Sequence, residues 1–238
     1  THVEMNRRSS EPLVSKHNEA LKVMPVLFSQ QGYDVTVCDP VYANYSWIPD
    51  LSIFDDYPEI DTYITKGNFS DPSQKEMVIQ NNYRNFFCFG IMKTMPLAFQ
   101  SIIYGNGQYN QAASNTDKVV YSSQTVESIS QSSGLSAAFM EPYNVLVNLP
   151  HMTLITETDI NTFLFMTNDA THEPMLLKVP EYAPAVNVDN REYDATHTDR
   201  FTLDGRTLIM ETDRQMMHYQ CNMAAMIQLG NWFDYLRE

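Results

Sequence analysis

Positive charge is scarce in this chain. Its 238 residues include 15 Lys and Arg against 29 Asp and Glu, which gives a formal net charge of −14. A surface of this sign repels the phosphate backbone of nucleic acids and the headgroups of anionic lipids. We therefore expect no nucleic-acid partner. An anionic substrate would need a local positive charge, supplied by a bound metal ion or by a pocket of His, Lys or Arg.

Long apolar runs and cysteine are also scarce. No apolar run approaches the roughly 20 residues of a membrane-spanning helix, and no signal-peptide core follows the first charged residues. We therefore expect no transmembrane segment in this chain. The three cysteines, Cys38, Cys88 and Cys221, are odd in number, far apart and set in apolar patterns. This favours buried thiols over a disulfide framework or a zinc site.

Glycine is sparse, and its spacing disfavours common nucleotide and hydrolase motifs. The eight glycines form no G-x-x-x-x-G-K-[ST] loop and no G-x-G-x-x-G loop, and the chain has no G-x-S-x-G elbow. Four histidines have no partner at metal-ligand spacing: His2, His17, His151 and His197. None of them resembles the paired histidines of a helical zinc motif.

Helix and strand patterns alternate along the sequence. A helix over residues 18–31 stops at Gly32, and a short strand follows over residues 35–38. A second helix should start near Pro72 and break at Pro96. The later patterns indicate a helix over residues 136–148, strands over residues 152–155 and 162–167, and a last helix capped by Asp213 with an apolar face from Met216 to Leu236.

This order of elements predicts an α/β fold with a layered, mostly parallel sheet flanked by helices. We expect one domain over residues 1–238. Within it, the Asn-, Gln- and Ser-rich residues 105–133 should form a polar connector, and the acidic residues 180–212 a surface excursion.

Thr171 and His172 follow the strongest predicted strand, whose apolar residues 163–166 lead into them. In an open α/β sheet, ligands bind beyond the carboxyl ends of the strands. His172 could bind a metal as a neutral imidazole or hold an anionic substrate oxygen through its N–H groups. The alternative is a loop histidine bonded to its neighbours. In an extended turn Glu173 would point elsewhere, so the two residues should not form a ready-made pair of ligands.

Asp39 and Trp47 are the corresponding candidates after the first strand. Asp39 lies where the strand over residues 35–38 ends, although an Asp-Pro sequence is equally typical of a turn. Trp47 lies in an aromatic loop over residues 42–49, where it could stack on a substrate or cover the core.

Three segments, taken in order, resemble a known family. Residues 21–39 contain a helix that ends in Gly-Tyr before a strand, residues 163–174 a strand that leads into His-Glu-Pro, and residues 218–236 a late helix. Together they resemble the sulfatase-like part of the alkaline phosphatase superfamily, and within it the membrane-bound lipoteichoic acid synthase type. There the late helix precedes the metal-binding strand.

The resemblance implies an extracytoplasmic enzyme, anchored in the bacterial cell membrane, that acts on phosphate or sulfate esters. It also implies a divalent metal, manganese or zinc, in the parent enzyme, where the metal activates the nucleophile and neutralises the transferred group. The family's nucleophile and its Asp-His-Gly metal motif are missing from this sequence. By resemblance the chain is therefore an interior fragment of a larger alkaline phosphatase-like domain, inactive by itself and without a metal of its own.

The resemblance also implies roles for single residues. His172 matches a position that contacts the anionic substrate, with Thr171 beside it, and Trp47 matches an aromatic that packs on a phosphoglycerol group. The family's histidine at the end of the preceding strand is Asp39 here, and no arginine follows Trp47. Phosphoglycerol specificity is therefore not implied, and a sulfate ester, another phosphoester or a cationic headgroup stays open.

The alternative function is a noncatalytic module that binds cell-surface glycans or peptides, with residues 42–47 as an aromatic platform. Such a module should be complete in itself. A fragment would instead expose a sheet edge or an apolar face and could self-associate to cover it.

Overall fold

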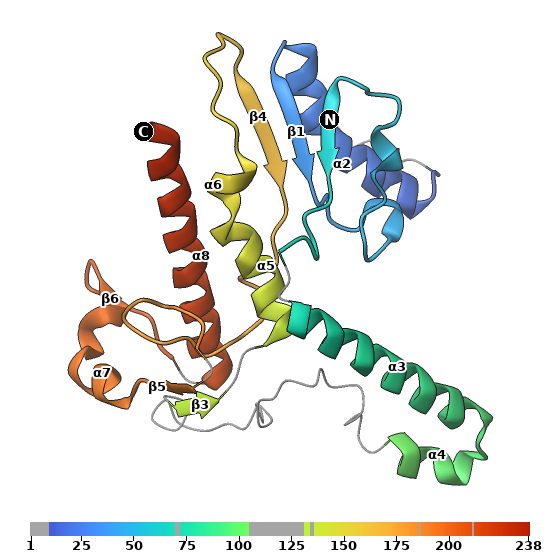
Figure 1. The fold of residues 1–238 in the computed structure, drawn as a ribbon, viewed down its shortest axis with the longest axis vertical. Coiled ribbons are helices and arrows are strands. Elements are labelled where there is room, and N and C mark those ends of the chain that lie inside the picture. Colours follow the sequence, from blue (N-terminus) through green and yellow to red (C-terminus); the bar gives the residue numbers. More distant parts are fainter. Residues whose placement is uncertain (1–9, 70–71, 105–130, 134–135, 186, 211) are drawn as a thin grey trace. The chain divides into compact units, whose positions relative to one another are not determined.

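The structure, a computed structural model, describes residues 10–69, 72–104, 131–133, 136–185, 187–210 and 212–238 (Figure 1). Its contacts divide the chain into two compact units. The first comprises Thr1–Asn68 and His151–Asn168, and the second comprises Phe69–Pro150 and Asp169–Glu238. Each unit has an apolar core of its own, and the single domain expected over residues 1–238 stays a prediction.

The first unit is built on a small parallel sheet. Helix α2 (Leu13–Gln30) leads through Gly32 into strand β1 (Asp34–Cys38). Strand β1 pairs in parallel with β2 (Ile60–Tyr63) on one side and with β4 (Thr162–Met166) on the other, which gives the order β2-β1-β4 (Figure 1). Gly32 has a φ of 81°, a conformation that glycine adopts without strain, so it ends α2 and turns the chain into the sheet.

Apolar residues on one face of the sheet, together with residues of the helices beside it, form this unit's core. Val35 and Val37 of β1 are fully buried and pack with Ile60 of β2. Phe28 of α2 stacks on Phe163 of β4 with ring centroids 4.1 Å apart, which holds the helix against the sheet. The expected α/β class is confirmed in this form, a small parallel sheet flanked by helices.

The second unit is mainly helical. Its elements are, in chain order, α3 (Pro72–Thr94), α4 (Leu97–Tyr104), β3 (Gln131–Ser133), α5 (Ala137–Val147), β5 (Asn187–Asp189), α7 (Arg191–Thr196), β6 (Thr202–Leu203), β7 (Arg206–Thr207) and α8 (Asp213–Arg237). The short helix α6 (Leu149–Met152) lies where the chain passes from the second unit to the first. Strand β3 pairs antiparallel with β5, and β6 with β7. Helix α5 packs on α8, where Gln228 donates a hydrogen bond to the Tyr143 hydroxyl at 3.3 Å.

Helix α8 starts and packs differently from the expectation. The Thr212 hydroxyl accepts a hydrogen bond from the Gln215 N–H, and the Gln215 side chain accepts one from the Thr212 N–H, which is a capping box. The expected cap at Asp213 is therefore wrong by one residue. The predicted apolar face is wrong in its second half, because Met226 and Phe233 are exposed. The buried residues of α8 are Met216, Met217, Gln220, Cys221, Ala224 and Ala225.

Other expectations have mixed outcomes. Pro96 separates α3 from α4, and the helix expected over residues 136–148 is α5, so both are confirmed. The strand expected over residues 152–155 is wrong, because α6 ends at Met152 and Leu154 is exposed in an irregular segment. An apolar run without a partner strand gains nothing from an extended conformation.

Two predicted regions lie in the second unit. Of the polar connector predicted over residues 105–133, only residues 131–133 are described, and they form β3; residues 105–130 lie outside the described part of the chain. The surface excursion predicted over residues 180–212 contains β5, α7 and the β6–β7 hairpin. It also buries Val188 and Asn190.

Candidate functional site

Asp39 ties together the ends of two neighbouring strands. It is buried directly after β1, in the left-handed conformation with a φ of 49°. Its N–H donates to the Tyr63 carbonyl at the end of β2 at 3.1 Å. One carboxylate oxygen accepts a hydrogen bond from the Thr65 N–H at 2.9 Å, and the other accepts one from the Thr65 hydroxyl. This geometry gives Asp39 a structural role, while its contact with a substrate stays a prediction.

Trp47 lies in the loop that follows Asp39, and its side chain is exposed. The Tyr42 ring lies beside it with centroids 6.1 Å apart, and the Lys66 ammonium lies 5.1 Å from the centroid of the indole. The loop is held in place by Asn44, whose side chain donates to Asp50 at 2.8 Å and whose N–H donates to Asn18 at 2.9 Å. The result is an exposed aromatic face with a cation beside it, a combination that suits a sugar ring or an anionic ester.

His172 presents its imidazole to solvent from a turn. Its side chain is 77 % exposed, and its Nδ1 lies 3.3 Å from the Glu173 carboxylate. The turn is therefore not the extended one in which Glu173 would point elsewhere. The backbone N–H of His172 donates to the Asp169 carbonyl at 2.9 Å, which closes the turn. When Nδ1–H donates to Glu173, Nε2 is left for a ligand. It can then accept a hydrogen bond in the neutral ring and donate one in the imidazolium.

Side chains of helix α8 hold this turn by hydrogen bonds to its backbone carbonyls. Arg214 donates to Nε2 of His218 at 3.2 Å, so Nε2 is an acceptor and Nδ1 carries the proton. That Nδ1–H donates to the Thr171 carbonyl at 3.1 Å. Farther along α8, the Cys221 thiol donates to the Glu173 carbonyl at 3.4 Å. The residues before and after His172, Thr171 and Glu173, are therefore both hydrogen-bonded to α8 through their backbone carbonyls.

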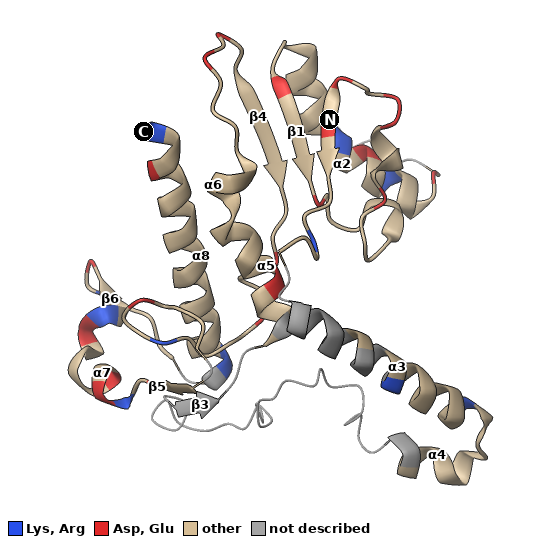
Figure 2. Ribbon diagram, in the orientation of Figure 1, with Lys and Arg blue, Asp and Glu red and all other residues tan. Residues whose placement is uncertain are grey.

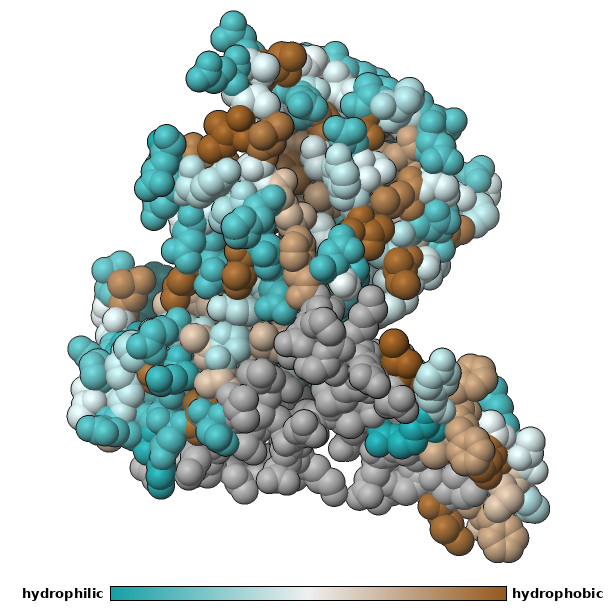
Figure 3. Space-filling model, viewed as in Figure 1, coloured by the Kyte–Doolittle hydropathy of each residue, from teal (hydrophilic) through white to brown (hydrophobic). Residues whose placement is uncertain are grey.

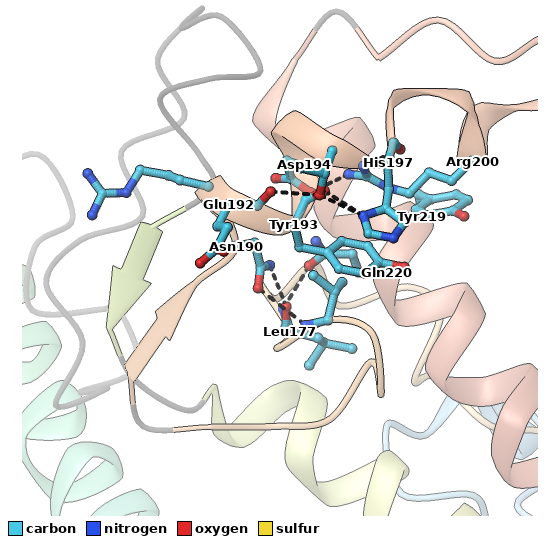
Figure 4. A network of polar contacts seen from close by, with 12 residues as sticks. Leu177, Asn190, Glu192, Tyr193, Asp194, His197, Arg200, Tyr219 and Gln220 are labelled. Atoms are coloured by element: carbon cyan, nitrogen blue, oxygen red, sulfur yellow. Dashed lines mark hydrogen bonds and ion pairs between the residues drawn. The ribbon is translucent and has the colours of Figure 1, made fainter.

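The chain after the turn is held by buried amide side chains. Gln220 accepts a hydrogen bond from the Leu177 N–H at 2.7 Å, and Asn190 donates to the Leu177 carbonyl at 2.8 Å (Figure 4). Asn190 also accepts one from the Val179 N–H at 3.2 Å. These side chains supply the partners that a neighbouring strand would otherwise provide. Among the described residues, Nε2 of Gln220 is buried without a partner.

The acidic residues that follow are paired with arginine. Asp194 forms a largely buried ion pair with Arg200, whose guanidinium lies 4.2 Å from the centroid of the Phe201 ring (Figure 4). The Arg191 guanidinium donates two hydrogen bonds to Asp189 and its backbone N–H donates a third, which together lower the pKa of that carboxyl from 3.8 to about 2. The acidic excursion is thus partly neutralised by its own basic residues.

The two buried thiols are poor nucleophiles. Burial raises the pKa of Cys38 from 9.0 to about 11, with a smaller contribution from the Asp39 carboxylate. Burial raises the pKa of Cys221 from 9.0 to about 12, although its bond to Met175 acts in the opposite direction. Both are protonated at neutral pH, which agrees with the interpretation of these cysteines as buried apolar residues.

The predicted site residues divide between the two units. Asp39 and Trp47 belong to the first unit, and Thr171 and His172 belong to the second. Sequence reasoning missed Thr65, which carries no signal in the sequence. It also missed two buried polar residues that hold the segment after His172. One of these, Gln220, lies within the apolar pattern of the last helix, where a polar residue on the buried side is the available signal; the other is Asn190.

A metal site was not expected in this chain. In the described ranges, no group of three or more His, Cys, Asp and Glu side chains is placed to hold a metal ion. Over the same residues, no helix has the length and apolar character needed to cross a membrane. No protein-family model, no curated protein and no solved structure matches the chain.

Proposed function

We propose that this chain is part of an extracytoplasmic, metal-dependent hydrolase or transferase that acts on phosphate or sulfate esters. The fold proposed for the whole catalytic domain is alkaline phosphatase-like, of the lipoteichoic acid synthase type. The observation that carries the proposal is the exposed imidazole of His172 on a turn held by α8. A substrate-binding group is effective when its backbone is fixed before the ligand arrives, because less entropy is then lost on binding.

The role proposed for His172 is to hold an anionic oxygen of the substrate. Its Nδ1–H donates to Glu173, which fixes the ring, and Nε2–H of the imidazolium donates to the ester oxygen. Thr171 lies next to it in the turn and is also exposed. A divalent metal would activate the nucleophile and neutralise charge on the transferred group. The described residues do not form a site for that ion, so none of them is assigned to it.

The first test is binding of inorganic phosphate and inorganic sulfate to the chain, followed by NMR of ¹⁵N-labelled histidine. Addition of either anion should shift the imidazole signals of His172, and the His172→Ala variant should lose the response. His151→Ala is the matched control, because His151 is also exposed but is not a proposed ligand. An unchanged His172 signal at saturating anion would contradict the proposal.

The second test measures turnover. In the full-length protein, His172→Ala should lower kcat on p-nitrophenyl phosphate or p-nitrophenyl sulfate by about 10²–10³-fold, the usual effect of losing one donor to a developing anion. Circular dichroism should remain unchanged. Enzyme-like turnover by the present chain alone would refute the proposal that its catalytic groups lie elsewhere.

A noncatalytic binding module is the second candidate, and the aromatic face around Trp47 favours it. Trp47 is 70 % exposed with Tyr42 and Lys66 beside it. The chain has two tryptophans, so Trp232→Phe leaves Trp47 as the sole reporter. Quenching or a blue shift of its fluorescence by oligosaccharides, with no histidine response to phosphate, would favour the binding module over the enzyme.

A further inference from the structure

The α3–α4 hairpin carries an exposed apolar face. On α3, Ile79, Tyr83, Phe86 and Phe87 are exposed, and their spacing of four, three and one residues places them on one side of the helix. Phe86 is 84 % exposed. A side chain of this kind is normally buried, so a contiguous row of them marks a surface that meets a partner.

Helix α4 extends this surface. Its exposed apolar residues include Leu97, at 85 %, and Ile102. The two helices are joined tightly at Pro96: the Phe99 N–H donates to the Pro96 carbonyl at 2.9 Å, and Gln100 donates to the Met95 carbonyl at 3.1 Å. Figure 3 shows apolar and aromatic side chains gathered on this hairpin beside a few hydrophilic ones.

The hairpin differs in charge from the rest of the chain. Residues 72–104 contain three basic residues, Lys75, Arg84 and Lys93, and one acidic residue, Glu76, so their net charge is +2 in a chain of −14. In the described part of α3, basic residues are present and acidic ones are not (Figure 2). Lys93 follows Phe86 by seven residues, two helical turns along the same side. Its position places an ammonium at the border of the apolar face.

We propose that the α3–α4 hairpin is an interfacial arm that lies on an anionic membrane surface. Its exposed apolar face would enter the boundary between headgroups and acyl chains to a depth of about 5–10 Å. Arg84 and Lys93 would extend to the phosphate groups of the lipids. This is contact with a surface and requires no membrane-spanning helix. The overall charge of −14 predicts repulsion from such lipids, and the local charge of the hairpin overcomes it at this one place.

Charge favours a lipid surface over a second copy of this chain. A two-fold symmetric pair of hairpins would bring the basic residues of one copy against those of the other, since the same patch lies on both sides. An anionic bilayer offers opposite charge together with an apolar interior. The inference is independent of the proposed function, because vesicle binding is measured without substrate and anion binding at His172 without lipid.

The test is sedimentation of the chain with vesicles of phosphatidylcholine alone or mixed with phosphatidylglycerol. We expect binding to the anionic vesicles that weakens as salt is added, because surface charge is screened. The Phe86→Ser, Phe87→Ser double variant should lower the partition coefficient about tenfold or more, given the apolar area removed. Lys93→Glu should weaken binding to anionic vesicles only. Leu154→Ser, at an equally exposed position outside the hairpin, should bind as the unchanged chain does.

Two results would overturn the inference. One is equal sedimentation of the double variant and the unchanged chain with anionic vesicles. The other is a dimer in analytical ultracentrifugation that the Phe86→Ser, Phe87→Ser variant converts to monomer, together with no vesicle binding by the unchanged chain. The second result would assign the same face to a second copy.

Discussion

The side chain of Gln220 on α8 accepts a hydrogen bond from the backbone N–H of Leu177 at 2.7 Å, across 43 residues of sequence. Both residues are almost fully buried. The segment that follows His172 is thus held by a helix side chain where a sheet would use a neighbouring strand. Gln220 shares this role with Asn190, which binds the Leu177 carbonyl and the Val179 N–H.

The Gln220→Met variant should be less stable than the unchanged chain. It keeps the volume of the side chain but removes the acceptor of the Leu177 N–H, and a buried unpaired donor costs about 1–3 kcal/mol. Loss of the unpaired Nε2 group offsets part of this cost, so the lower end of the range is expected. Urea unfolding measures the change. Asn231→Ala, at an exposed position of the same helix, should change stability by only a few tenths of a kcal/mol.

The bond between Asp39 and Thr65 should stabilise the first unit. Thr65→Val preserves the shape of the side chain but removes the hydroxyl that donates to the buried carboxylate. We expect a loss of about 1–3 kcal/mol in the free energy of unfolding. Thr62→Val on β2 is the control, because it makes the same substitution close by in the sequence at a position that is not fully buried. Equal stability of the two variants would mean that the carboxylate finds another partner.

Two strands could be predicted from the sequence because their own residues favour a buried strand. Strands β1 and β4 consist largely of β-branched, aromatic and other apolar residues, as buried parallel strands do. Strand β2 was missed because it has only four residues and includes Asp61. Its extended conformation comes from pairing with the side of β1 that β4 does not occupy, and such tertiary contacts cannot be read from four residues. Residues 152–155 have the opposite character, an apolar run with no partner strand.

Contacts that polar side chains make with residues far away in the sequence could not be predicted. His172 and Asp39 were found because each follows a strand. The contacts with Thr65 and Gln220 were not, since Thr65 carries no signal in the sequence and a helical pattern treats Gln220 as a polar interruption. The stripe predicted on α8 fails for the same reason: the helix turns Gln220 inward to meet Leu177 and leaves Met226 exposed.

Stability should fall at alkaline pH because of the two buried thiols. The folded chain raises the pKa of Cys38 to about 11 and that of Cys221 to about 12, against 9.0 for an ordinary thiol. The unfolded chain therefore releases these protons first as pH rises. Their contribution to stability is complete below pH 9.0 and is lost as pH rises through about 11 and about 12.

Urea unfolding at a series of pH values checks this. Cys221→Ala should flatten the decline above pH 9.0 relative to the unchanged chain. Cys88→Ala, which removes a half-buried thiol, is the matched control substitution. Cys38 remains in this variant, and burial also raises the pKa of Tyr182, so a residual decline should persist in the Cys221 variant. A slope that does not respond to Cys221→Ala would mean that this thiol is not buried in solution.

His218 should act as a positioning residue for His172. Its Nδ1–H donates to the Thr171 carbonyl, so His218→Ala frees one side of the turn that presents the imidazole. Affinity for inorganic phosphate, followed through the His172 signals, should fall by about fivefold, equivalent to the roughly 1 kcal/mol of one hydrogen bond. His218→Asn should restore most of it, because the asparagine amide can donate from nearly the same place as Nδ1. A purely packing role for His218 would make the alanine and asparagine variants alike in phosphate affinity, whereas a tether of the turn requires them to differ.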